Sequence, residues 1–172
     1  MKNEYKNLRL LIAPRHIERT KELEQLIVKR GFNPIRFSEI MDYQLPVTSY
    51  QLRISILDTI GDLKTMYSAS DIVFVGGSLV KKGGQNPIEP ASLAKPIIIG
   101  KFTFNFQDVI KSFLENGAAI QVENKDELYS AIRLLIDSPK ERKKIGINAR
   151  DTVDKNSGSS QRTIDLILSL PI

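Results

Sequence analysis

The sequence predicts an α/β domain built on a doubly wound, mainly parallel sheet, because short apolar runs alternate with stretches of helical periodicity. Most of these runs are apolar at successive positions, which is typical of parallel strands covered by helices on both faces. Six strands are predicted, at Leu8–Ala13, Asn33–Phe37, Ile54–Leu57, Ile72–Val75, Pro96–Ile99 and Ala118–Val122. In such a fold a ligand binds beyond the carboxyl ends of the strands, where the strand order reverses.

Two of the predicted helices end at a glycine. One covers His16–Arg30 and stops at Gly31, a residue suited to the left-handed conformation that closes many helices. The other covers Asn105–Asn116, carries a complete apolar stripe and ends at Gly117. These stripes predict core positions and carry no functional assignment.

Two further helices are predicted towards the carboxyl terminus. An apolar stripe is formed by Leu128, Ala131, Ile132, Leu135 and Ile136. Ser138 then offers an N-cap, followed by a proline at the first helical position and the capping-box residue Glu141. Met41–Gln51 has no clean period and is predicted to be a loop, whereas Gln161–Leu170 is predicted to be a terminal helix that docks on this domain or on a partner.

Composition indicates one soluble globular domain and excludes several classes of site. The 172 residues are 41% hydrophobic and 26% charged, and they include no Cys and one His. These counts exclude a disulfide scaffold and cysteine-ligated zinc, and they argue against a histidine-built metal site. No apolar run approaches the ~20 residues of a membrane span, and the polar amino terminus does not resemble a signal peptide.

Positive charge is concentrated at the amino terminus. Residues 1–36 hold 9 Lys and Arg against 4 Asp and Glu, whereas the rest of the chain is balanced at 16 against 16. The asymmetry is compatible with an anionic ligand, an anionic membrane surface, nucleic acid or a merely solvated face. Nucleic acid is disfavoured, because aromatic residues make up only 7% and do not interleave with the basic ones.

Two junctions between a strand and a helix carry candidate binding residues. At Pro14–His16 a guanidinium and a helix N-terminus converge, which favours an anion, although a surface arginine beside a capping histidine explains the segment equally well. At the second junction Thr59 and Asp62 resemble a capping box, and Gly61 lets a ligand approach the backbone. Capping alone explains this second junction too.

The third junction, residues 76–90, is the most informative. Four glycines in nine residues and two lysines precede an Asn-Pro pair that opens a short helix, which predicts a backbone nest for an anion. Glu89 falls in the first turn of that helix, where its carboxylate can accept hydrogen bonds from ribose hydroxyls. So much glycine is costly to order, which argues against an ordinary connection. The sequence contains no P-loop, and no dinucleotide fingerprint follows the first strand.

Four motifs occur together in this chain: PRH, DTIGDLKTMYSASDIVFVGGS, GGSLVKKGGQNPIEPASLAKPIIIG and FTFNF. Together they resemble the carboxyl-terminal half of 3-deoxy-D-manno-octulosonic acid (Kdo) transferases, from about residue 8 to about residue 163. The resemblance implies that residues 1–172 form one Rossmann-like, three-layer α/β/α domain with a six-stranded sheet, the C-terminal half of a GT-B glycosyltransferase. It also implies CMP-Kdo as donor, a lipid A precursor as acceptor, inversion at the anomeric carbon, and neither metal nor cofactor.

The resemblance implies that three groups of residues contact CMP. They are Pro14 and Arg15; Gly61, Asp62 and Leu63; and Asn86, Pro87, Ile88 and Glu89. Further candidate donor contacts are His16, Gly77, Ser78, Lys81 and Lys82. Asp62 departs from the family, which usually has Glu there, and the shorter carboxylate changes the reach to the ligand.

In the family, the amino-terminal domain holds the base glutamate, the acceptor site and the membrane-binding surface, and no residue of this chain matches the base motif. We therefore expect this chain to bind CMP or CMP-Kdo without transferring sugar, and to be soluble and cytoplasmic by itself. The complete enzyme is expected at the cytoplasmic face of the inner membrane, in lipopolysaccharide biosynthesis. Two alternatives stay open: a GT-B transferase or epimerase that uses UDP-sugars, and a non-catalytic nucleotide-binding module.

Overall fold

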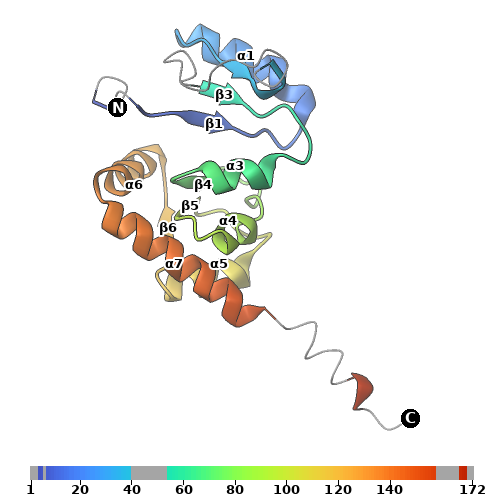
Figure 1. Ribbon diagram of the computed structural model, residues 1–172, viewed down its shortest axis with the longest axis vertical. Coiled ribbons are helices and arrows are strands. Elements are labelled where there is room, and N and C mark those ends of the chain that lie inside the picture. The colour runs from blue at the N-terminus through green and yellow to red at the C-terminus, as the bar shows by residue number, and fades with distance from the viewer. Residues whose placement is uncertain (1–3, 6, 40–53, 158–166, 170–172) are drawn as a thin grey trace. The chain divides into compact units, whose positions relative to one another are not determined.

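The computed structural model describes residues 4–5, 7–39, 54–157 and 167–169 (Figure 1). The chain divides into two compact units, Met1–Leu63 and Lys64–Ile172, and each unit contains a parallel sheet of three strands. That the whole chain acts as one domain stays a prediction.

The first unit contains a sheet of order β1-β3-β2, with β1 at Leu10–Ile12, β2 at Ile35–Arg36 and β3 at Ile54–Ile56. Between β1 and β2 lie the 3₁₀ turn η1 (Ile17–Arg19) and helix α1 (Thr20–Lys29). The predicted stop of this helix is confirmed, because Gly31 has a φ of +77°. The helix starts later than predicted, since its first turn is 3₁₀.

The second unit contains a sheet of order β4-β5-β6, with β4 at Val73–Val75, β5 at Ile97–Gly100 and β6 at Ala119–Val122. Helix α3 (Leu63–Ala69) leads into β4, and α4 (Ile88–Ser92) lies between β4 and β5. The longer helices α5, α6 and α7 complete the unit (Figure 1). Their bounds are Gln107–Glu115, Lys125–Asp137 and Pro139–Asn156.

The core of the second unit lies on both faces of β5, all of whose residues are buried. Ile97 and Ile99 belong to one hydrophobic cluster, which includes Phe113 of α5. Ile98 points to the opposite face and joins a second cluster with Leu135 of α6. Because helices cover both faces, the strand is apolar at successive positions, as the sequence predicts for a parallel strand.

The starts of α6 and α7 depend on side-chain caps. The Asn124 side chain accepts hydrogen bonds from the backbone amides of Asp126 and Glu127, at 2.9 and 3.0 Å. Ser138 Oγ accepts one from the amide of Glu141 at 3.3 Å, with a proline in the first turn. The predicted start of the last long helix is therefore confirmed.

The principal difference from the sequence prediction concerns the sheet. All six predicted strands are present and all the described pairings are parallel, but hydrogen bonds join them as two sheets of three rather than one of six. The predicted loop Met41–Gln51 lies outside the described residues, as does most of the predicted helix Gln161–Leu170. Among the described helices, none is both long and apolar enough to cross a bilayer.

Candidate functional site

Every predicted site residue follows the carboxyl end of a strand within its own unit, and folds of this class bind ligands beyond such strand ends. The first unit contains Pro14, Arg15, His16, Gly61, Asp62 and Leu63, which follow β1 and β3. The second unit contains Gly77, Ser78, Lys81, Lys82, Asn86, Pro87, Ile88 and Glu89, which follow β4.

The junction after β1 presents Arg15 to solvent. Pro14 is half-buried, whereas Arg15 and His16 are exposed. The side chain of His16 forms no capping hydrogen bond, so the alternative of a capping histidine is wrong. Among the described residues, no ion pair holds the Arg15 guanidinium, while Arg19 of η1 pairs with Glu22 at 3.0 Å. The charge of Arg15 is therefore available to an anion, although a short 3₁₀ turn replaces the predicted helix N-terminus.

The junction after β3 contains a hydrogen bond between two side chains. Thr59 Oγ1 donates a hydrogen bond of 2.6 Å to Asp62 Oδ2. Because α3 begins at Leu63, Asp62 precedes the helix instead of lying in its first turn, so the predicted capping box is wrong. Gly61 has a φ of +97°, and a Cβ built on it has no neighbour within 4 Å. The backbone at Gly61 is therefore open to close approach.

The carboxyl ends of β2 and β3 are joined through Asp58. Its carboxylate accepts hydrogen bonds from the amide and the hydroxyl of Ser38, at 2.9 and 2.7 Å. Burial by itself raises the pKa of the Asp58 carboxyl, but the hydrogen bonds from Ser38 and the charge of Arg36 outweigh burial and hold the pKa below its usual value.

This lowered pKa predicts that acid weakens the first unit. The folded state favours the Asp58 carboxylate, so its contribution is fully present above the unfolded pKa of about 3.9 and is lost as pH falls through the folded pKa. We expect Asp58→Ala to lower the free energy of unfolding at pH 7 by about 1–3 kcal/mol and to flatten its decline in acid. Urea denaturation at pH 7, 5 and 3 measures both effects. A variant with the wild-type profile would contradict the assignment.

The loop after β4, residues 76–86, is called the donor loop, after the donor contacts that the sequence predicts for it. Three of its glycines, Gly77, Gly83 and Gly84, have φ values of +78°, +82° and +75°. L-residues with a Cβ rarely adopt this region, so the glycines are required by the path of the chain. Lys81 and Lys82 are exposed on this loop.

Ser78 ties the donor loop to the sheet. The residue is fully buried, and its hydroxyl donates to the carbonyl of Val75 and accepts from the amide of Gly100 at 2.7 Å. Its own carbonyl accepts a hydrogen bond from the amide of Phe102 at 2.9 Å. The Ser78 hydroxyl is therefore engaged inside the protein, and any donor contact at this position would involve its backbone.

The turn that opens α4 holds Glu89 in a defined position. Asn86 Oδ1 accepts from the amide of Ile88 at 3.0 Å, and Asn86 Nδ2 donates to Glu89 Oε1 at 3.1 Å. Pro87 is fully buried, while Ile88 and Glu89 are exposed. Because α4 has only five residues and Asn86 occupies one of its amides, the helix dipole is a weaker source of positive potential than predicted. Within the described residues, Glu89 Oε2 accepts no hydrogen bond and can receive one from a ligand.

Sequence reasoning missed Tyr67 on α3. Burial raises the pKa of the Tyr67 phenol, and the nearby charge of Glu89 raises it further. The phenol is therefore neutral at physiological pH and can donate a hydrogen bond close to the Glu89 carboxylate. No local pattern links these two residues, which are 22 positions apart in the sequence, so only the fold reveals the pair.

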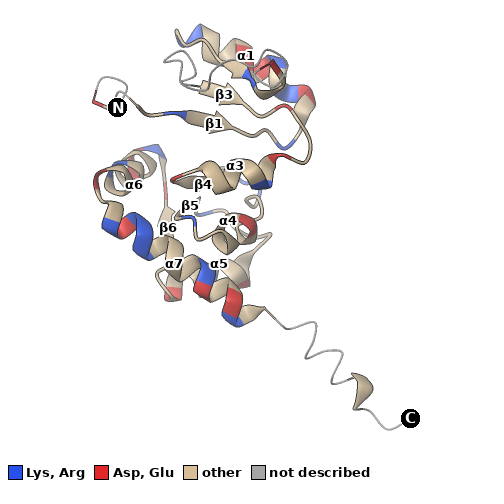
Figure 2. Ribbon diagram, in the orientation of Figure 1, with Lys and Arg blue, Asp and Glu red and all other residues tan. Residues whose placement is uncertain are grey.

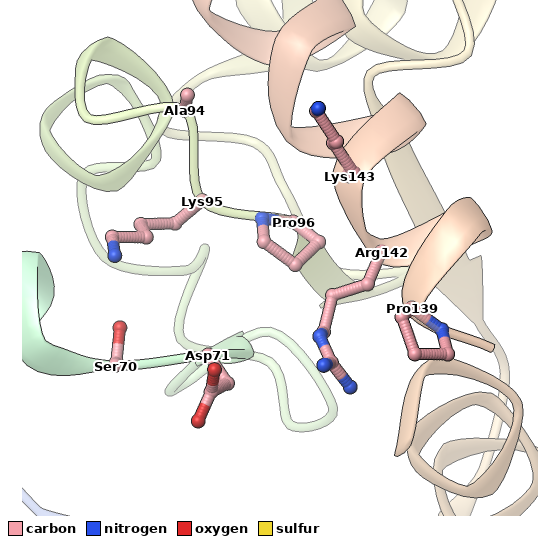
Figure 3. A pocket seen from close by; sticks show the side chains of 8 residues that line it. All are labelled: Ser70, Asp71, Ala94, Lys95, Pro96, Pro139, Arg142 and Lys143. Atoms are coloured by element: carbon pink, nitrogen blue, oxygen red, sulfur yellow. The ribbon is translucent and has the colours of Figure 1, made fainter. Parts of the chain in front are cut away.

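An open depression of about 250 Å³ lies at the opposite edge of the second sheet, before the strands begin (Figure 3). It is lined by Ser70, Asp71, Ala94, Lys95, Pro96, Pro139, Arg142 and Lys143. Figure 2 shows the basic residues at the start of α7. Arg142 Nη1 donates to the carbonyl of Leu135 at 2.8 Å, and Lys95 Nζ donates to that of Ser68 at 2.7 Å. These two cations therefore hold helix ends, and the depression contains no predicted site residue.

A parallel α/β domain with a glycine-rich loop and a carboxylate in the following turn is typical of nucleotide-binding domains. The family model for glycosyl transferases group 1 matches residues 34–152, and the chain belongs to this family. Among the described residues, no group of three or more His, Asp or Glu side chains is placed to hold a metal ion.

The predicted resemblance to Kdo transferases is confirmed. The chain is 39% identical over 164 residues to a 3-deoxy-D-manno-octulosonic acid transferase of Haemophilus influenzae, covering 95% of this chain and 37% of that protein. A transferase of the same description from Chlamydophila psittaci is 37% identical over 80% of this chain and 30% of its own length. The chain thus spans about a third of the length of these relatives.

A solved structure matches the fold. The C-terminal CMP-Kdo binding domain of WaaA from Acinetobacter baumannii superimposes with a TM-score of 0.80 at 25% identity. The match covers 88% of this chain and 77% of that domain. The family model and this solved structure both support the α/β fold class predicted from the sequence.

Proposed function

We propose that this chain is the donor-binding domain of a Kdo transferase and binds CMP-Kdo in lipopolysaccharide biosynthesis. The likeness to a CMP-Kdo binding domain over 88% of the chain carries the proposal. The positions of the candidate residues support it, because each group follows the carboxyl end of a strand. A lipid A precursor as acceptor and membrane association of the complete enzyme belong to the same proposal.

The reaction gives the candidate residues distinct tasks. The acceptor hydroxyl attacks the anomeric carbon of Kdo, and the bond from that carbon to the CMP phosphate oxygen breaks on the opposite face, which inverts the anomeric configuration. Negative charge then grows on the departing phosphate, where fixed cations are most effective. In this proposal Arg15, Lys81 and Lys82 are the cations that stabilise this negative charge.

Glu89 is proposed to hold the ribose of CMP. Asn86 fixes one carboxylate oxygen at 3.1 Å, which leaves the other to accept a hydrogen bond from a ribose hydroxyl. Because the carboxylate is already oriented, less side-chain freedom is lost on binding. The pyrimidine is proposed to lie near Gly61–Leu63, where the backbone at Gly61 is open.

The base that removes the proton from the acceptor hydroxyl is proposed to come from outside this chain. Such a base must lie within hydrogen-bond reach of the hydroxyl, and no residue here matches the family's base motif. Kdo transfer to a lipid A precursor by this chain alone would contradict this part of the proposal.

Calorimetric titration with CMP and UDP tests the donor site. We expect CMP to bind more tightly than UDP. We expect Arg15→Ala and Glu89→Ala each to lower the affinity for CMP about tenfold, or by about 1.4 kcal/mol. Lys111→Ala and Glu115→Ala, exposed positions on α5, are matched controls expected to bind as wild type.

Three outcomes would count against the proposed function. Unchanged CMP affinity in both site variants would remove the site assignment. A preference for UDP would favour a transferase or epimerase that uses UDP-sugars. Equal, weak binding of all nucleotides would favour a non-catalytic module.

A further inference from the structure

The donor loop is hydrogen-bonded to a residue to which the proposed function assigns no role. Asn105 follows β5, and its Nδ2 donates hydrogen bonds to the carbonyls of Lys82 and Gly84, both at 3.3 Å. Its backbone amide donates to the carbonyl of Gly83 at 3.4 Å. One residue therefore binds three consecutive carbonyls at the part of the loop that bears the lysines.

The fit between Asn105 and the donor loop leaves no spare room. A Cβ built on Gly83 would overlap the side-chain amide of Asn105 and the ring of Phe104. Gly83 is also held in the left-handed region, with a φ of +82°. The loop therefore lies directly against this segment, and only glycine permits the approach.

These three hydrogen bonds fix the orientation of the loop's peptide groups. In a planar trans peptide, the carbonyl and the following amide point in opposite directions. Because the carbonyls of residues 82 and 83 point to Asn105, the amides of Gly83 and Gly84 are turned away from it. Asn105 thus sets the course of the backbone from which Lys82 extends into solvent.

The composition of the loop explains why these hydrogen bonds matter for binding of the donor. Glycine loses more conformational freedom on ordering than any other residue, and four of the nine residues from Gly76 to Gly84 are glycine. A loop that is already ordered spares the ligand this entropic cost, which raises affinity without any added contact. The side-chain amide suits the task, because its NH₂ group carries two donors for two carbonyls.

We propose that Asn105 is a positioning residue for the nucleotide-sugar donor, which holds the donor loop in its binding conformation before the donor arrives. The inference rests on the proposed function. Asn105 is exposed and lies on the surface of its unit, so its loss affects the order of the loop more than the stability of the fold.

Two substitutions separate positioning from general stability. Asn105→Ala removes the side-chain donors, and Asn105→Asp keeps the shape but sets carboxylate oxygens against two carbonyl oxygens. Asn116→Ala is the matched control, because Asn116 Nδ2 also donates to a carbonyl, that of Ser112 at 2.8 Å, at the end of α5. Each protein is measured for CMP affinity, for urea denaturation, and for the mobility of the Gly83 and Gly84 amides by NMR relaxation without ligand.

We expect Asn105→Ala to lower the affinity for CMP about tenfold, and Asn105→Asp to lower it further. Both variants should mobilise the two glycine amides, with urea midpoints no lower than that of Asn116→Ala. Wild-type affinity or wild-type amide mobility in Asn105→Ala would overturn the inference while the proposed function stands. A urea midpoint that falls in parallel with affinity would reduce Asn105 to a structural residue. If the wild-type chain binds neither CMP nor UDP, the proposed function fails and the inference fails with it.

Discussion

Gly146→Ala is expected to destabilise the second unit by about 2 kcal/mol, although the same change inside a helix normally stabilises by about 1 kcal/mol. Gly146 is buried in the middle of α7, against the connection between α4 and β5. A Cβ built there would overlap the carbonyl oxygen of Ala94 and would lie 3.5 Å from Cδ of Pro96. Overpacking of this kind costs about 1–3 kcal/mol and sometimes more, so the steric cost exceeds the gain in helix propensity.

The connection cannot easily move aside. Ala94 has a φ of +54°, the only positive value at a described residue other than glycine. Its amide donates to the carbonyl of Ala91 at 2.9 Å, and the amide of Lys95 donates to that of Pro90 at 3.1 Å. These hydrogen bonds close α4, so a displaced Ala94 also disturbs the helix that carries Glu89.

Urea denaturation of Gly146→Ala beside Lys155→Ala, an exposed position on the same helix, measures the effect. The control is expected to stay within about 0.5 kcal/mol of wild type. A gain in stability for Gly146→Ala would mean that helix propensity outweighs the contact, and would contradict the close approach of α7 to Ala94.

The secondary structure could be predicted because each strand and long helix carries its own local signal. The run at Ile97–Ile99 is apolar at successive positions and lies buried between two layers of helices. Gly31 and Gly117 have positive φ values at the ends of α1 and α5, as their places in the sequence predict. Such signals span a few residues, so one sequence is enough to detect them.

The parts that could not be predicted depend on contacts between distant segments. Asn105 binds carbonyls 21 and 23 positions earlier, and Tyr67 lies near Glu89 of another helix. Composition shows that the donor loop is rich in glycine but does not show what presses against Gly83. At Thr59 and Asp62 the spacing fits two arrangements, a capping box and a direct side-chain contact, and the helix boundary decides between them.

Gly100→Ala is expected to lower the free energy of unfolding by about 3 kcal/mol and to weaken CMP binding as well. Gly100 ends β5, where its amide donates to the Ser78 hydroxyl at 2.7 Å. A Cβ on Gly100 would overlap the carbonyl group of Ser78 and would meet the amide nitrogen of Leu79 at 2.6 Å. The obstacle is the backbone peptide group between Ser78 and Leu79, which cannot rotate away as a flexible side chain can.

The control for Gly100→Ala is the same substitution at the start of the donor loop. A Cβ on Gly76 meets nothing within 4 Å, and neither glycine has a positive φ, so the two variants differ in the space around the added methyl group. Gly76→Ala should keep the stability and the CMP affinity of wild type. If Gly100→Ala weakens CMP binding by disturbing the donor loop, NMR should show displaced Ser78 and Leu79 amides in a chain that is still folded. Equal behaviour of the two variants would contradict the close crossing of β5 and the donor loop, on which the placement of Lys81 and Lys82 depends.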